Sequence, residues 1–222
     1  MGVAELDMSG RLLVIHAMLQ FYGNAASHQL AWQVSEDVSN HWNEAEGTVW
    51  INGHQYRVKF IIQGVFHPGL TELEVISNTD PQINYFRVEE FASGNISFVD
   101  GINSNTGYFK LDNLLNNSTT AAHEFGHTIG LDHPEITDIR GKGVPGIMYP
   151  RGTLVDPPFQ YDPTARPGEK GGTLNPYFRK VLQNDIDDLQ LNKLNFSETG
   201  HAILGGFSSV WHEADVRRDF KI

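Results

Sequence analysis

The spacing of hydrophobic and polar positions predicts a chain that mixes strands with a few helices. Residues 11–19 are a mostly apolar run, which is typical of a buried strand. Residues 25–43 carry apolar side chains at four-residue intervals, which predicts an amphipathic helix packed on a sheet. These side chains are Leu30, Val34, Val38 and Trp42.

Short strands are predicted next along the chain. Residues 48–51 and 55–62 flank Asn52-Gly53, a dipeptide that favours a tight β-hairpin. Further short strand candidates are separated by Gly, Asn and Asp turns; they are residues 72–76, 84–88, 95–99 and 107–111.

A second helix is predicted from about residue 119 to about residue 129, with Asn117 or Ser118 as its cap. Phe125 and Ile129 are expected to anchor it on the sheet. Residues 134–177 are rich in Pro, Gly and Asp and lack periodicity, so an irregular ordered segment is expected.

A last helix is predicted over residues 179–192, followed by a tail with one short apolar segment at residues 202–204. The inner face of this helix would consist of Val181, Leu182, Ile186 and Leu189.

Composition narrows the class of protein. With 222 residues, 40% hydrophobic and 19% charged, the chain has the length and composition of one folded domain. No apolar run reaches the length of a membrane helix. The net charge of −11 argues against nucleic acid and anionic membranes as partners, and it mildly favours basic substrates.

Cysteine is absent, which excludes disulfides and thiolate metal ligands within these residues. Residues 11–19 faintly resemble a signal peptide, with Ala25-Ala26 as the cleavage site. The acidic Glu5 and Asp7 ahead of the run and His16 within it argue against that interpretation. We therefore expect a module without an export signal of its own.

The strongest pattern is His-Glu-Phe-Gly-His-Thr-Ile-Gly-Leu-Asp-His at residues 123–133. His123 and His127 are four residues apart, so their rings lie on one face of a helix, one turn apart. Gly130 can take a left-handed conformation that ends the helix and turns the chain. His133 then becomes a third ligand, and three imidazoles with an open position are typical of a catalytic zinc site.

These residues resemble the metzincin zinc endopeptidases, whose signature is H-E-x-x-H-x-x-G-x-x-H followed by a methionine turn. Gly146-Ile147-Met148-Tyr149-Pro150 begins shortly after His133 and matches that turn. Pro150 resembles the matrixin branch, whereas Pro134 resembles the serralysin branch, so the subfamily stays open.

The resemblance implies an α+β fold. It would have a twisted mixed sheet with two helices in an upper subdomain, a cleft, and a smaller irregular lower subdomain with one helix. We expect one catalytic domain over residues 1–222. It would divide into an N-terminal subdomain at about 11–133, a C-terminal subdomain at about 134–192 and an extension at 193–222.

The resemblance also implies roles. His123, His127 and His133 would hold one zinc ion, and Glu124 would act as general base on a water bound at the zinc. Met148 would form an apolar floor beneath the histidines, and Tyr149 would have no catalytic role. A substrate would pair with an edge strand, for which residues 95–99 are the candidate. Residues 134–160 would wall the pocket for the residue after the cleaved bond.

Other polar clusters are weaker candidates. Seven further histidines have no partner at ligand spacing and are expected to have surface or core roles: His16, His28, His41, His54, His67, His201 and His212. Residues 100–105 alternate oxygen-bearing side chains that could hold calcium, a second candidate cofactor, but they lack a closing glutamate. A simple turn is therefore favoured there.

Three functional hypotheses stay open at this point. The first is a zinc-dependent endopeptidase acting on protein or peptide substrates. The second is a catalytically silent zinc or peptide-binding module, against which the intact Glu124 argues. The third gives the protease a biological role, because residues 104–109 and 140–143 resemble protease modules of bacterial Rhs-type polymorphic toxins. That role implies a secreted or delivered bacterial protein and an immunity protein as a partner.

Overall fold

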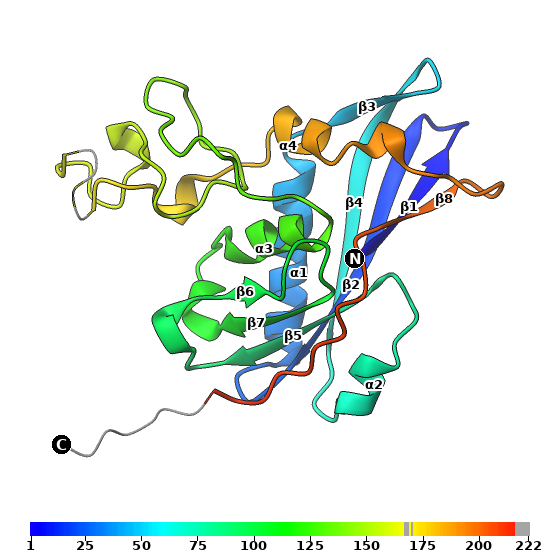
Figure 1. Ribbon diagram of the computed structural model, residues 1–222, viewed down its shortest axis with the longest axis horizontal. Helices are drawn as coiled ribbons and strands as arrows, with labels where there is room; N and C mark the ends of the chain where they lie inside the picture. The colour runs from blue at the N-terminus through cyan, green and yellow to red at the C-terminus, as the bar shows by residue number, and fades with distance from the viewer. Residues whose placement is uncertain (167–168, 170, 216–222) are drawn as a thin grey trace.

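Eight strands form one mixed sheet in the computed structural model, which describes residues 1–166, 169 and 171–215 (Figure 1). The strands are β1 (Gly2–Asp7), β2 (Leu12–Tyr22), β3 (Thr48–Ile51), β4 (His54–Phe66), β5 (Ile83–Glu89), β6 (Phe98–Val99), β7 (Thr106–Lys110) and β8 (His201–Leu204). Along the sheet the order is β3-β4-β2-β5-β7-β6, and β1 pairs with both β2 and β8.

Within the described residues, four α-helices accompany the sheet: α1 (His28–Asn43), α2 (Glu72–Ile76), α3 (Thr120–Thr128) and α4 (Gln183–Asp188). The same part of the chain has five single 3₁₀ turns, at Ser93–Asn95, Leu111–Asn113, Pro157–Phe159, Pro176–Phe178 and Leu191–Lys193. In the described part of the chain, no helix is long and apolar enough to cross a membrane.

The predicted buried strand at residues 11–19 is confirmed as the centre of the sheet. β2 pairs in parallel with β4 on one side, and on the other side with β1 and then β5. Its fully buried residues alternate with half-buried ones, as the two-residue period of a strand requires. The buried side chains of β2 point to the face on which α1 packs, where they join the same hydrophobic core.

The apolar stripe of α1 is buried as predicted, and it also holds the second helix. Figure 1 shows α1 and α3 on the same side of the sheet. The Trp42 indole Nε1 donates a hydrogen bond of 3.0 Å to the Ala122 carbonyl of α3. The Phe125 ring meets the Trp42 ring edge-on at 6.0 Å between centroids. Phe125 and Ile129 are both buried in the core, so the predicted anchoring of α3 is confirmed.

The hairpin at Asn52-Gly53 is also confirmed, with β3 and β4 pairing antiparallel on either side of it. Both turn residues have positive φ, 49° for Asn52 and 77° for Gly53, as a tight hairpin turn requires. β4 continues to Phe66, four residues beyond the predicted strand.

The strand predicted at residues 72–76 is wrong, because these residues form helix α2. The Thr71 side chain accepts from the backbone of Glu74, while the Glu74 carboxylate accepts from the backbone of Thr71. This reciprocal capping box stabilises a helical turn. Five residues were too few for periodicity to distinguish the two structures.

Two further predicted elements are shorter than expected. Of residues 95–99, only Phe98 and Val99 form the edge strand β6. The helix predicted over residues 179–192 is confined to α4, because Arg179 and Leu182 are extended and Gln190 is left-handed with φ 50°. The irregular segment predicted at residues 134–177 is confirmed in its described part, where it forms the lobe on the left of Figure 1.

The sequence pattern missed β1 and the role of the tail. β8, which contains the apolar segment at residues 202–204, pairs antiparallel with β1 and so extends the sheet. Beyond β8 the chain crosses the sheet face opposite α1 and α3. There the Trp211 ring stacks on Tyr22 at 4.9 Å, and the Arg87 guanidinium donates to the His212 carbonyl. Residues 216–222 of the predicted extension lie outside the described residues.

Taken together, the predicted fold class is confirmed: the protein is α+β, with a curled open mixed sheet, two helices packed on it and an irregular C-terminal part with one α-helix. No described feature tests the predicted domain boundaries, which stay a prediction.

Replacing Phe125 with alanine should strongly destabilise the protein, because it removes the ring that fixes α3 against Trp42. We expect Phe125→Ala to lower the free energy of unfolding by about 3–5 kcal/mol in urea denaturation of the metal-free protein. Leu73→Ala is the matched control, since Leu73 is 73% exposed, and it should change stability by less than about 0.5 kcal/mol. Equal effects of the two substitutions would contradict this packing.

Candidate metal centre

Helix α3 begins where Ser118 and Thr119 turn the chain out of the preceding loop. The predicted capping by Ser118 is found in part: its hydroxyl accepts from the Thr120 backbone at 3.2 Å, although the residue at the cap position is Thr119. The Thr119 hydroxyl donates instead to the Pro176 carbonyl at 2.5 Å. Every residue of α3 is buried, so its position is fixed on all sides.

The helix ends at Gly130 as predicted. Gly130 has φ 114°, a backbone conformation that side chains other than glycine rarely adopt. The Leu131 N–H donates to the Gly126 carbonyl at 2.9 Å and closes the turn. A Cβ atom at position 130 would also lie only 2.9 Å from the Asn103 side chain. The chain therefore reverses here and brings His133 back over the helix.

Three imidazoles converge as the sequence predicts. The Nε2 atom of His133 lies 3.0 Å from Nε2 of His123 and 3.1 Å from Nε2 of His127. The three ligand atoms lie within 4.8 Å of one another, and they form the single group of this kind among the described residues. His123 and His127 are buried, whereas His133 is exposed, so the site opens to solvent on the His133 side.

Backbone carbonyls fix the two buried rings. Nδ1 of His123 donates to the Ile147 carbonyl at 2.7 Å, and Nδ1 of His127 donates to the Leu131 carbonyl at 2.7 Å. With the proton on Nδ1, each Nε2 presents a lone pair to the shared point. Such hydrogen bonds are the usual support of a metal-binding histidine.

This arrangement fits a zinc ion. Tetrahedral zinc with bonds of about 2.0–2.1 Å would place its nitrogen ligands about 3.3–3.4 Å apart, close to the separations observed. Burial is the main cause that lowers the pKa of all three imidazoles below the ordinary value. The neutral, metal-binding form is therefore favoured at neutral pH. His123, His127 and His133 could thus hold one metal ion.

Glu124 lies beside the three histidines and is buried. Burial raises the pKa of its carboxyl group to about 8, against the opposing effects of the Arg179 charge and a hydrogen bond from the Val99 backbone. A divalent cation nearby would lower this pKa again, because an opposite charge favours the ionised form. The carboxylate lines the same cavity as His123 and His133.

Met148 lies against α3 at Gly126, and its predicted role as an apolar floor for the histidines stays a prediction. It is buried, and its sulfur occupies the space that a side chain at Gly126 would need. Gly126, between the two helical histidines, therefore has a packing role that the sequence interpretation missed. Asp185 of α4 supports the same turn from below. Its carboxylate accepts from the backbone of Leu182 at 2.7 Å, and the backbones of Ile147 and Met148 also hydrogen-bond to it.

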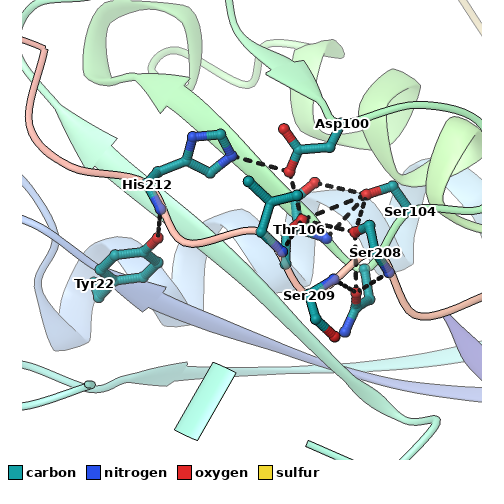
Figure 2. Close-up of polar contacts among 9 residues, drawn as sticks. Tyr22, Asp100, Ser104, Thr106, Ser208, Ser209 and His212 are labelled. Carbon is teal, nitrogen blue, oxygen red and sulfur yellow. Dashed lines mark hydrogen bonds and ion pairs between the residues drawn. The ribbon is translucent and has the colours of Figure 1, made fainter. Parts of the chain in front are cut away.

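The other polar candidates stay apart from this centre. Among the described residues, none of the seven remaining histidines joins a group of metal ligands. Asp100, first in the loop considered for calcium, accepts instead from the Thr106 hydroxyl and pairs with His212 Nε2 at 2.9 Å (Figure 2). Ser104 and Thr106 hydrogen-bond to Ser208 of the C-terminal segment. The loop is thus a turn that fastens this segment to the sheet.

Arg179 is the other residue at the site that sequence reasoning missed. It precedes α4 in an extended segment, yet it is buried and lines the cavity with Glu124. A single arginine among the residues Phe178 to Lys180 gives no periodic signal, and its approach to α3 depends on the path of the irregular segment. No local pattern could have placed it there.

Comparisons with known proteins leave the family open. The sequence matches no protein-family profile and no curated protein. Solved structures resemble it loosely. A chaperone–substrate complex has a TM-score of 0.43 and 14% identity over 82% of this chain, which spans only 34% of that chain.

Two further structures show a similar degree of likeness. Myroilysin has a TM-score of 0.39 and 10% identity, covering 88% of this chain and 100% of its own. Archaemetzincin from Methanopyrus kandleri has a TM-score of 0.39 and 14% identity, covering 80% and 95% respectively. At TM-scores below 0.5, these likenesses assign no function to this chain.

The site predicts one zinc ion per chain with His133 as an essential ligand. We expect His133→Ala to weaken zinc binding at least about a hundredfold in competition with a chromophoric chelator. Losing a hydrogen-bond partner of a ligand already costs about 10–100-fold in affinity, and losing the ligand itself should cost more. His201→Ala, at an exposed histidine in β8, should bind zinc as the unchanged protein does. Unaltered affinity in His133→Ala would contradict the three-histidine site.

Proposed function

We propose that this protein is a zinc-dependent endopeptidase that hydrolyses peptide bonds. The observation that carries the proposal is the convergence of three imidazole Nε2 atoms at a cavity that a buried glutamate also lines. Three neutral ligands and an open side are typical of catalytic rather than structural zinc sites. The metzincin-like spacing of residues 123–133 and the methionine turn support the same assignment.

Each residue of the site has its own role in the proposed reaction. His123, His127 and His133 would hold the ion, which supplies a Lewis acid that polarises the peptide carbonyl and lowers the pKa of water to about 7. Glu124 takes up a proton on a carboxylate oxygen as water attacks the carbonyl carbon. It then delivers that proton to the nitrogen of the leaving amine. Burial favours the protonated carboxyl and so suits this intermediate role.

The edge of the sheet is the proposed path of the substrate. β6 is the last strand in the sheet order and pairs antiparallel with β7. Ile96 and Ser97, just before β6, line the cavity that contains Glu124. An extended peptide could therefore add to this edge and place its scissile bond beside the histidines. Because β6 has only two residues, side-chain pockets rather than long backbone pairing would determine the choice of substrate.

Loss of Glu124 should abolish turnover while leaving the metal in place. We expect Glu124→Gln to lower kcat/KM on a fluorogenic peptide library by about 10²–10⁴-fold, with zinc content unchanged. A chelator should stop cleavage by the unchanged protein, and added zinc should restore it. Full activity in Glu124→Gln would refute the mechanism. Absence of any cleavage by zinc-loaded protein would favour the silent binding module.

We further propose that the protease acts as a delivered bacterial toxin with a cognate immunity protein as partner. The support is the resemblance of residues 104–109 and 140–143 to toxin protease modules. The proposal predicts that producing the chain in a bacterial cytoplasm slows growth, whereas Glu124→Gln at equal abundance does not. Equal growth with both forms would count against the toxin role and leave the protease chemistry untouched.

A further inference from the structure

A buried arginine lies beside the metal centre. Arg179 is only 5% exposed, although it carries a full charge. Its Nε donates to the Thr119 hydroxyl at 3.0 Å, and its Nη1 donates to the Tyr149 carbonyl at 3.1 Å. Within the described residues, no carboxylate comes within 4.0 Å of this guanidinium. The Glu124 charge acts on this guanidinium only from beyond ion-pair distance. The cost of burying the cation is therefore only partly offset, which favours a further anionic partner.

The cavity that Arg179 lines is next to the catalytic groups. It has a volume of about 360 Å³ and is lined by His123, Glu124 and His133 as well as by Arg151 and Arg179. Glu124 is the one acidic residue in this lining, and the charges of both arginines act on it. The protein as a whole has a net charge of −11. The local excess of positive charge is therefore opposite in sign to the whole chain.

The arginine keeps both its charge and its capacity for further hydrogen bonds. Burial lowers the pKa of Arg179 only to about 10, so the side chain is a cation at neutral pH. A guanidinium has five N–H donors in a planar fork, and the two hydrogen bonds to Thr119 and Tyr149 use two of them. The remaining donors match the geometry of a carboxylate, which arginine binds in a bidentate manner.

We propose that Arg179 recognises an acidic side chain of the substrate, at the residue directly after the cleaved bond. This inference rests on the proposed peptidase function and names its substrate class. Glu124 delivers a proton to the leaving amine, so the residue that contributes this amine lies on the Glu124 side of the metal. The cavity lined by Glu124 and Arg179 is on that side. Exposed Arg151 at its rim adds to the attraction.

The alternative is that Arg179 only holds the methionine turn in place through its bond to Tyr149, or acts on the reacting carbonyl. In either case its loss would reduce cleavage of all peptides alike. Recognition of an acidic side chain would instead change the ratio between acidic and neutral substrates. The discriminating quantity is therefore this ratio and not the activity itself.

The experiment compares peptides that differ only by Glu or Gln after the cleaved bond, with the sequence around it chosen from a library digest. The zinc-loaded protein should cleave the Glu peptide with a kcat/KM roughly tenfold or more above that of the Gln peptide. In Arg179→Gln this ratio should fall to about one, whereas Arg179→Lys should keep a preference for Glu. Arg57→Gln, at an exposed arginine in β4, is the matched control and should keep the full ratio.

A ratio near one in the unchanged protein, or equal losses on both peptides in Arg179→Gln, would overturn the inference. If Arg179→Gln does not fold, as judged by its thermal melting, the Glu-to-Gln ratios of the unchanged protein and of Arg179→Lys still test the inference.

A binding measurement separates this inference from the peptidase proposal. Zinc-loaded Glu124→Gln should bind the Glu peptide roughly tenfold more tightly than the Gln peptide in fluorescence anisotropy. Such a preference without cleavage by the unchanged protein would refute the peptidase alone.

Discussion

The candidate metal centre depends on two carbonyl groups that fix the rings of His123 and His127. These carbonyls belong to Ile147 and Leu131, which lie in separate turns after the helix. The first turn is held by Asp185 of α4 and the second by the reversal at Gly130. The helix is in turn fixed by Trp42 of α1. The orientation of the two rings, and with it the direction of their nitrogen lone pairs, therefore depends on the sheet, the helices and the irregular segment together.

The parts of this structure that follow from local spacing could be predicted from sequence. The stripe of α1, the Asn52-Gly53 turn and the His123, His127 and His133 set each depend on residues near one another in the chain. Helix α2 could not be predicted, because a five-residue segment fits the period of a strand as well as that of a helix. Its capping box stabilises the helix. The pairing of β1 with β8 joins residues about two hundred positions apart, and no pattern within either segment specifies the partner. The position of Arg179 at the cavity likewise depends on the course of the whole irregular segment before it, and not on a local pattern.

Charge is distributed unevenly in a way that the overall composition conceals. The sequence has an excess of acidic residues, which taken alone favours basic partners. The cavity at the histidines has two arginines and one glutamate, and a bound zinc ion would add two further positive charges. Interactions in a partly buried cavity are screened less than those at the surface. The local field, rather than the net charge, should therefore govern which side chain enters.

The coordination of the bound metal tests the account most directly. Extended X-ray absorption fine structure at the zinc edge of the zinc-loaded protein reports the number and type of ligand atoms. The account predicts three imidazole nitrogens and one oxygen at about 2.0–2.1 Å. A zinc ion with fewer than three imidazoles, or with the Met148 sulfur among its ligands, would contradict it.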